Sequence, residues 1–392
     1  MEAIELIQLI SRGEDSRTQF KRDVTNEVSL ASEFVAFSNA EGGRILIGVD
    51  DHGNITGITL DNIRRLNILI SNASEHVRPP INPITENVGT DRGLVMVVTI
   101  RKGISKPYQD NQGVYWMKSG ADKRRSSREE IQRIFQSGHL IHADEVPVTG
   151  TTTDDIDMDH FSEFFGRQFN KPLAHVLDED EGVTTSRVLN NLGLAKEETI
   201  NLAGLLLFGR QPQRYCPAFI VKAISYFGND PSGIQYRDSD DFTGCLRDLY
   251  EGTFSFLTRN LCRLQRKNDG FNAEGDLEVP VVAIQELVVN MLLHRDYFIS
   301  APCRVMIFDN RIELISPGSL PNNLTVEHIQ NGVSVIRNPL IASFATQELP
   351  YRGMGTGIRR ALNEVPELKL KSDPNQNLFT ACIPREAILK DR

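Results

Sequence analysis

Cysteines are few in this sequence and lie far apart. The 392 residues hold five, Cys216, Cys245, Cys262, Cys303 and Cys382, and no two of them form a C-x-x-C pair. That spacing fits neither a disulfide framework nor a structural zinc site. We therefore expect buried, reduced thiols and a reducing compartment.

Long apolar runs are absent as well. No stretch approaches the roughly 18 consecutive apolar residues that a membrane span needs. The first residues, MEAIELIQLISRGEDS, carry acids where a secretion signal carries lysine and arginine. The sequence therefore predicts a cytoplasmic protein without a membrane partner.

An excess of positive charge is the third missing feature. The formal net charge is −9 and the isoelectric point is near 5.5, which excludes a uniformly cationic coat for nucleic acid. Any nucleic-acid site must therefore be a local basic patch. A G-x-x-x-x-G-K-[ST] loop is also absent, which excludes a P-loop motor such as a helicase.

Apolar periodicity organises the N-terminal third of the chain. The length predicts two or three domains. The first of them reads as α+β, with expected helices over 2–12, 29–43, 60–77 and 127–138, a hairpin over 44–58, and strands over 94–100 and 113–120.

The composition changes after residue 142. Residues 143–158 are rich in Thr and Asp without an apolar period, which is typical of a linker. Further on, the apolar density of 201–228 indicates paired buried strands with a turn at Gly209 and Pro212, and a long amphipathic helix is expected from about 240 to 267. We expect an N-terminal domain over 1–142, a linker over 143–158, a middle segment over 159–270 and a C-terminal domain over 271–392.

Three sequence blocks in the N-terminal third resemble the Schlafen AlbA domain. Each block alone is typical of local structure, such as a helix stop or a tight turn. Together they keep that family's order, spacing and residue types over roughly residues 1–135, and the resemblance implies a nucleic-acid-binding domain. The blocks are GEDSRTQFK (13–21), AFSNAEGG (36–43) and IGVDDHG (47–53).

The same resemblance implies a set of nuclease positions. Nuclease-active Schlafen proteins use three carboxylates, which fall here on Glu14, on Gln19 and on Asp50 or Asp51. Divalent cations prefer oxygen ligands and activate water for phosphodiester attack. A neutral glutamine at the middle position weakens metal binding, so the resemblance implies weak or absent cleavage, with Glu14 as the remaining metal ligand.

The densest positive charge in the sequence is KRRSSR at 123–128. Its alternatives are a solvated loop and a phosphate-binding surface, which holds a nucleic-acid backbone without reading its sequence. Tyr115 and Trp116 are either core aromatics or a stacking platform. The candidate phosphate contacts are Lys21, Arg22, Lys118, Lys123, Arg124, Arg125 and Arg128.

In the C-terminal domain, a polar stripe crosses a helix that is apolar nearly all round, expected over 281–293. Glu286, Asn290 and His294 are four residues apart and share one face. Buried polar groups need partners, which come from another segment or from a ligand. A G-x-G-x-G loop at 353–357 opens a later helix, and such loops suit phosphate.

Together these segments resemble the divergent GHKL ATPase branch often labelled RecG-like. The matching blocks are NLAGLLLFG (201–209), ELVVN (286–290), HRDY (294–297), SPGSLP (316–321), RNP (337–339) and GMGTGI (353–358). The resemblance implies an α/β GHKL-like (Bergerat-type) sandwich that binds ATP and Mg²⁺. Glu286 would be the base of a slow ATPase and Asn290 the Mg²⁺ ligand, while SPG at 316–318 replaces the adenine-reading Asp box. The implied nucleotide contacts are Asn290, His294, Ser316, Gly318, Arg337, Asn338, Gly353, Gly355, Thr356 and Gly357.

Three functions remain open at this point. The first is a nucleic-acid-binding regulator of transcription or of a stress or defence response, controlled by ATP binding. The second is a metal-dependent nuclease of tRNA or single-stranded DNA in phage defence. The third is an oligomerising scaffold whose sites have decayed. We expect nucleic acid and nucleotide as partners, and a homo-oligomer.

Overall fold

The computed structural model describes residues 1–392 except 139, 180–181, 233–234, 265–274, 322–323 and 386–392. The chain forms two compact units, Met1–Ile141 and His142–Arg392. We call them the N-terminal and C-terminal units. In the described part of the chain, no helix has the length and apolar character needed to cross a membrane.

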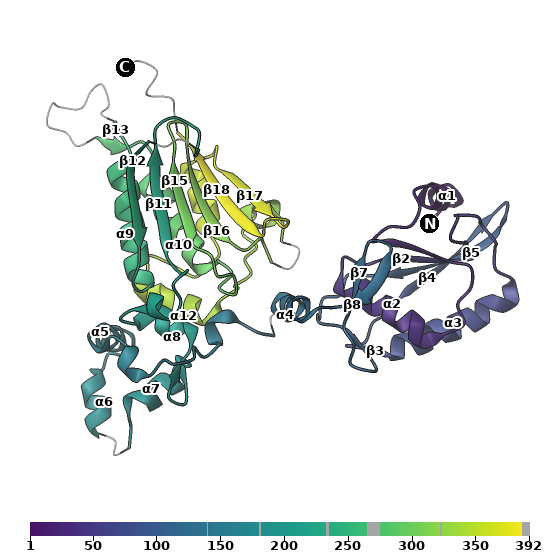
Figure 1. The fold of residues 1–392 in the computed structure, drawn as a ribbon, viewed down its shortest axis with the longest axis horizontal. Helices are drawn as coiled ribbons and strands as arrows, with labels where there is room; N and C mark the ends of the chain where they lie inside the picture. Colours follow the sequence, from purple (N-terminus) through teal and green to yellow (C-terminus); the bar gives the residue numbers. More distant parts are fainter. Residues whose placement is uncertain (139, 180–181, 233–234, 265–274, 322–323, 386–392) are drawn as a thin grey trace. The chain divides into compact units, whose positions relative to one another are not determined.

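The N-terminal unit is built on a four-stranded sheet in the order β1-β2-β5-β4. The strands are β1 (Thr18–Lys21), β2 (Gly43–Ile47), β5 (Gly93–Ile100) and β4 (Ile84–Thr90). β1 and β2 run parallel, and the helix α2 (Glu27–Asn39) connects them. Figure 1 shows α1 (Ala3–Ser11) on one face of the sheet, and α2 and α3 (Leu60–Glu75) on the other.

Two apolar clusters fill the two faces of this sheet. Phe20 and Leu46 pack with Leu6 and Ile10 of α1, whereas Ile45 belongs to the cluster under α2 and α3. Successive strand residues thus alternate between the clusters. A two-stranded hairpin, β7 (Trp116–Ser119) and β8 (Asp122–Arg125), packs on α2 and precedes α4 (Arg128–Ser137). The short strands β3 (Val77–Arg78) and β6 (Gln109–Asp110) pair beside it.

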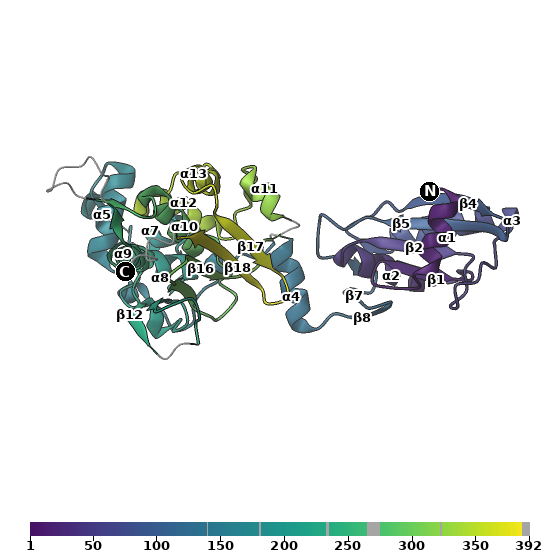
Figure 2. The same cartoon turned by 90° about the horizontal axis from the view of Figure 1, so that it is seen from above.

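The C-terminal unit is a layer of helices on a six-stranded sheet, in the order β12-β11-β15-β16-β18-β17. β11 and β15 are parallel, and the other neighbours are antiparallel. Figure 2 shows α10, α12 and α13 on one side of β16 and β18. The strands, in sheet order, are Tyr236–Phe242, Val221–Tyr226, Cys303–Ile307, Arg311–Pro317, Leu378–Pro384 and Lys369–Asp373.

Helices α9 (Leu246–Asn260), α10 (Val281–Leu293), α12 (Pro339–Glu348) and α13 (Gly357–Glu364) form that layer, and α11 (Val326–Gln330) packs beside α13. The middle segment adds α5 (Met158–Phe169), α6 (Leu173–Glu179), α7 (Thr185–Asn191) and α8 (Leu202–Phe208). One apolar core spans both sets, because the rings of Phe164, Phe208 and Phe344 contact one another across α5, α8 and α12.

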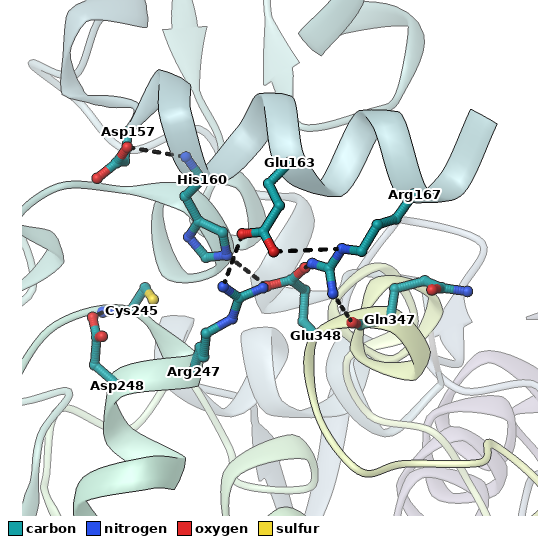
Figure 3. Close-up of polar contacts among 9 residues, drawn as sticks. All are labelled: Asp157, His160, Glu163, Arg167, Cys245, Arg247, Asp248, Gln347 and Glu348. Carbon is teal, nitrogen blue, oxygen red and sulfur yellow. Dashed lines mark hydrogen bonds and ion pairs between the residues drawn. The ribbon is translucent and has the colours of Figure 1, made fainter. Parts of the chain in front are cut away.

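An ion-pair cluster also joins the middle segment to the helix layer (Figure 3). The Glu348 carboxylate is only 1% exposed. It contacts His160 at 2.6 Å, Arg167 at 2.7 Å and Arg247 at 2.9 Å. These partners lie on α5 and α9, so one buried anion holds three helices together. We call these four residues the Glu348 cluster.

The predicted linker, 143–158, is packed against the C-terminal unit. Asp144 is fully buried and accepts a hydrogen bond from the backbone N–H of Ile341 at 2.9 Å. Val148 N–H donates to the carbonyl of Ile200. Thr152 and Asp155 form a capping box on the short 3₁₀ turn Thr153–Asp155, and Asp157 caps α5, so part of their abundance reflects capping and not a free segment.

Two strand predictions were wrong. Leu202–Phe208 form the helix α8, which Asn201 caps by accepting from the N–H of Gly204. This helix is buried on all sides, so it has no periodicity to distinguish it from a buried strand. The hairpin expected at 44–58 is only half present, because β2 pairs with β1 and β5, and the return segment forms a single bridge between Val49 and Ile55.

Candidate functional site

The polar stripe of α10 faces a pocket in the C-terminal unit. α10 is buried along most of its length, and Glu286 is 5% exposed. Asn290 and His294 line the pocket beside Glu286. The Asn290 Nδ2 donates to the Glu286 carbonyl at 2.6 Å, which orients the amide along the helix.

The glycine loop forms the opposite wall of this pocket. Gly353 and Gly355 have φ angles of +68° and +66°, which side chains other than glycine rarely adopt. A Cβ atom at Gly357 would lie 2.5 Å from Glu286 Oε2 and 3.0 Å from Asn290 Nδ2. The absence of a side chain at Gly357 therefore lets the loop approach the stripe without displacing Glu286 or Asn290.

All but one of the predicted nucleotide contacts line the pocket. Ser316 and Gly318 come from the end of β16, and Arg337 lies just before α12. The predicted contacts in the lining are Asn290, His294, Ser316, Gly318, Arg337, Gly353, Gly355, Thr356 and Gly357, together with the predicted base Glu286. Much of the remaining lining is apolar and includes Leu287, Met291, Leu320, Ile329, Val333, Ile358 and Phe379. The pocket thus combines an apolar interior with a polar and glycine-rich end, as ligand sites commonly do.

Asn338 is the exception. It is fully buried, and its Nδ2 donates to the carbonyls of Leu293 at 2.8 Å and Arg295 at 2.9 Å. The side chain therefore satisfies carbonyls at the end of α10. Its position supports the pocket wall but does not line the pocket.

Glu286 has a partner that the sequence analysis did not single out. Arg360 Nη2 on α13 lies 2.6 Å from Glu286 Oε1. Burial raises the pKa of Glu286, and the charges of Arg360 and Arg352 oppose that rise. Arg360 follows Gly357 by one helical turn, but this pairing depends on the packing of two helices that are far apart in sequence.

Two further basic side chains, His294 and Arg337, border the pocket, and only Arg337 is charged at pH 7. Burial and the nearby Arg337 lower the pKa of His294 to about 4, so this imidazole is neutral at pH 7. Burial also lowers the pKa of Arg337, and Asp296 opposes that effect. Arg337 Nη2 donates to the Ser319 carbonyl at 2.6 Å. Arg337 is therefore a fixed cation in the wall.

The predicted nuclease positions do not converge in the N-terminal unit. Glu14 and Asp51 line one hollow together with Phe20. Gln19 does not line it, because its amide contacts Glu33 of α2 at 3.3 Å on the other face of β1. Asp50 accepts from the N–H groups of His52 and Asn54 and so caps the turn.

A metal site is not evident from these positions. Over the part of the chain that the structure describes, no group of three His, Cys, Asp or Glu side chains is placed to hold a metal ion. Hydrogen bonds, first the side-chain amide of Asn54, lower the pKa of Asp50. The geometry therefore assigns Asp50 to the turn and leaves Glu14 and Asp51 as a pair.

The buried surroundings of Gln19 contain two charged residues. Lys118 Nζ lies 3.4 Å from Gln19 Oε1 and 3.9 Å from Glu33 Oε2, and its side chain is 2% exposed. Burial lowers the pKa of Lys118, which Glu33 opposes. The sequence does not point to Glu33, because this residue lies in the middle of an otherwise buried helix and outside the three blocks that resemble the Schlafen AlbA domain.

Several cations of the predicted phosphate surface are already paired. Lys118 is buried, Lys123 lies 3.1 Å from Glu33, and Arg124 is bound by both oxygens of Glu130 at 2.6 and 2.7 Å. The exposed arginines Arg125 and Arg128 remain on the hairpin side, where Arg125 lies over the ring of Trp116. Lys21 and Arg22 follow one another at the end of β1.

The aromatic residues of the hairpin are anchored. Trp116 Nε1 donates to Asp110 Oδ2 at 2.7 Å, and its ring packs against the α2 cluster. Tyr115 contacts the ring of Phe135 edge-on. Both aromatic side chains are therefore held by the fold, and only the exposed faces remain for a base.

Charge is divided unequally between the two units. Met1–Ile141 contains 18 lysines and arginines and 18 aspartates and glutamates, so the whole formal charge of −9 falls on His142–Arg392. An anionic polymer is therefore repelled less by the N-terminal unit than by the C-terminal unit.

Two protein families match separate parts of this chain. Residues 14–127 match the family described as "Schlafen, AlbA_2", and residues 300–377 match "Putative ATP-dependent DNA helicase recG C-terminal". The chain thus joins a Schlafen AlbA_2 domain to a RecG-type, HATPase-like C-terminal domain. These are the two families that the sequence blocks resemble, and the mixed α and β architecture with open sheets confirms the expected fold class.

Two solved structures are among those that match this chain. The DIP2311 protein from Corynebacterium diphtheriae is 16% identical, covers 97% of this chain and 69% of its own, and has a TM-score of 0.45. The N-terminal domain of a putative ATP-dependent DNA helicase RecG-related protein from Nitrosomonas europaea is 20% identical. The match covers 33% of this chain and 95% of the Nitrosomonas europaea domain, with a TM-score of 0.23. A search of curated proteins gave no match.

Proposed function

We propose that this protein binds ATP in the C-terminal pocket and nucleic acid on its AlbA_2 domain. The AlbA_2 match supports nucleic-acid binding, and the RecG-type match supports a nucleotide site on a DNA-associated protein. We further propose that ATP binding regulates the nucleic-acid function, in transcription or in a stress or defence response. Nucleotide binding is the part of this function that the geometry supports best.

One observation carries the nucleotide proposal. Gly357 lies directly against Glu286 and Asn290, so a loop rich in backbone N–H groups meets the polar stripe of α10 inside one pocket. α13 begins at Gly357, and the N-terminus of a helix favours phosphate. The apolar part of the pocket is suited to a base and the polar end to phosphates. Mg²⁺, if present, would reach Asn290 together with the nucleotide.

Hydrolysis is a separate question from binding. A general base acts best when its carboxylate is free and its pKa lies near the working pH. Here Arg360 engages one Glu286 oxygen. We therefore propose a nucleotide sensor with slow turnover.

The test is a thermal melt of the full chain with ATP, ADP or GTP, each with Mg²⁺. ATP at about 100 times its dissociation constant stabilises the folded state by about 2.7 kcal/mol, so the melting temperature should rise. Asn290→Ala should remove most of that rise, because it deletes the polar group beside the glycine loop. Asn191→Ala, an exposed asparagine at the end of α7, is the matched control. No shift with any of the three nucleotides would contradict the proposal.

A further inference from the structure

Arginines line a hollow at the edge of the AlbA_2 domain, away from the basic hairpin. Arg12, Arg17 and Arg44 all border it, and the glycine pair Gly42 and Gly43 contributes backbone to its lining. The three arginines are exposed and lie far apart in the sequence. We call this feature the arginine hollow.

The β-sheet brings the backbones of Arg17 and Arg44 together. The N–H of Arg44 donates to the carbonyl of Arg17 at 2.7 Å, and the register pairs Thr18 with Arg44. Side chains two apart on a strand share a face, so Arg44 points the same way as Leu46, which packs in the α1 cluster. That direction leads to the end of α1, where Arg12 is the C-cap residue.

The glycine pair allows close contact between backbone segments at the base of the arginine hollow. A Cβ atom at Gly42 would lie 2.6 Å from the backbone nitrogen of Lys102 and 2.8 Å from the carbonyl oxygen of Ile100. Gly42 also has a φ of +74°, which disfavours any side chain. The floor is therefore backbone, and the guanidinium groups stand around it.

The arginine hollow has unneutralised positive charge. Across the residues that the structure describes, no hydrogen bond or ion pair engages the guanidinium of Arg12, Arg17 or Arg44. The lining also holds two acids, of which only Glu41 has a cationic partner. Asp15 accepts from the backbone N–H of Arg17 at 2.8 Å, and Glu41 pairs with Lys102 at 2.6 Å.

The contrast with the hairpin is informative. Lys118, Lys123 and Arg124 each have an acidic partner within 4 Å, so an incoming phosphate must compete with a carboxylate there. Arg12, Arg17 and Arg44 form no ion pair among the described residues, although Asp15 and Glu41 also line the arginine hollow. Guanidinium groups also match phosphate geometry with two parallel donors, which lysine lacks.

We propose that the arginine hollow is a phosphate-binding site that holds the sugar-phosphate backbone of a bound nucleic acid. This inference rests on the proposed nucleic-acid function and assigns a second contact surface to it. Contacts of this kind fix the position of the polymer and carry no sequence information.

The experiment is a fluorescence-anisotropy titration of the full chain with a labelled single-stranded oligonucleotide at several salt concentrations. The double variant Arg12→Ala/Arg44→Ala should bind about tenfold more weakly near 0.1 M salt. Its slope of log affinity against log salt should be shallower by about 1.4, because each single-strand phosphate contact contributes about 0.7. The charge-preserving variant Arg12→Lys/Arg44→Lys should keep most of the slope.

The matched control is Arg64→Ala/Arg78→Ala, which removes two exposed arginines elsewhere in the same unit and should leave the slope unchanged. If the wild type binds and both alanine variants bind equally well, the arginine hollow is not a contact, although the nucleic-acid proposal stands. If the wild type binds no oligonucleotide at low salt, both proposals fail. A last outcome is that inorganic phosphate raises the melting temperature of the wild type but not of the double variant, while the oligonucleotide raises the melting temperature of neither protein. The arginine hollow then binds free anions, and its assignment to the nucleic-acid backbone is wrong.

Discussion

Glu286 is the only carboxylate in the described lining of the nucleotide pocket, and its charge is countered inside the fold. A buried anion without a partner is costly, so an empty pocket needs a cation such as Arg360. A nucleotide would bring its own negative charge to this end of the pocket. Glu286 and the nucleotide therefore compete for Arg360.

This competition predicts the behaviour of an Arg360 variant. In Arg360→Ala, Glu286 loses its partner, burial then raises the pKa of its carboxyl further, and the carboxylate becomes a better base. We expect nucleotide hydrolysis at least about tenfold faster than in Glu286→Gln, and faster than in the wild type. Phosphate release under single-turnover conditions measures it.

The neighbouring Arg359→Ala is the control, since Arg359 is exposed on the same helix and is not part of the pocket lining. Slower hydrolysis in Arg360→Ala than in Arg359→Ala would mean that Arg360 serves the phosphates directly. That result would contradict the competition described here.

At the residue level, the sequence predicts what lies on one helix and misses what packing brings together. Glu286 and Asn290 were found because a spacing of four puts them on one face. Arg360 and Glu33 were not, because their partners are distant in sequence. Gln19 was assigned to a trio with Glu14 by family resemblance, yet the alternation of β1 directs it to the other face.

At the level of elements, the Glu348 cluster is the main polar connection between α5, α9 and α12 (Figure 3). Burial alone raises the pKa of Glu348, but the hydrogen bond and charge of His160 and the charges of Arg247 and Arg167 outweigh it. The pKa therefore lies below its usual range. Removing this carboxylate leaves Arg167 and Arg247 with the exposed Glu163 as their remaining acidic partner.

Glu348→Gln should lower the free energy of unfolding of the C-terminal unit by about 3 kcal/mol at pH 7. A depressed carboxyl pKa contributes stability above the unfolded value, near 4.3, and loses it as pH falls through the folded value. The difference between wild type and variant should therefore hold from pH 7 to about 5 and shrink below about 4. Urea titrations over this range measure it.

The exposed Glu327→Gln on α11 is the control and should change stability little at any pH. A Glu348→Gln effect that stays constant down to pH 3.5 would show that shape, and not charge, holds the three helices.

Most helices could be predicted from periodicity, but the fully buried helix α8 and the parallel pairing of β1 with β2 could not. α8 is buried on all sides, so its residues show no face. The parallel pairing of β1 with β2 requires the crossover through α2, whereas the local sequence predicts only a hairpin with a turn at 51–54. Both failures arise where long-range packing decides the structure.

At the level of the whole molecule, the two units differ in charge and in chemistry. The balanced N-terminal unit carries the arginine hollow and the hairpin, whereas the C-terminal unit carries all the net negative charge and the nucleotide pocket. Nucleic acid should therefore contact the AlbA_2 domain alone, and the salt dependence of its binding should reflect that unit's few arginines.

The most direct test of the central claim is an isothermal calorimetric titration of the full chain with ATP and Mg²⁺. We predict saturable binding at one site per chain. Asn290→Ala should weaken it at least about tenfold, which corresponds to about 1.4 kcal/mol, and Asn191→Ala should leave it unchanged. Absence of saturable heat at two temperatures for the wild type, or equal affinity in Asn290→Ala, would contradict nucleotide binding in the pocket between α10 and the glycine loop.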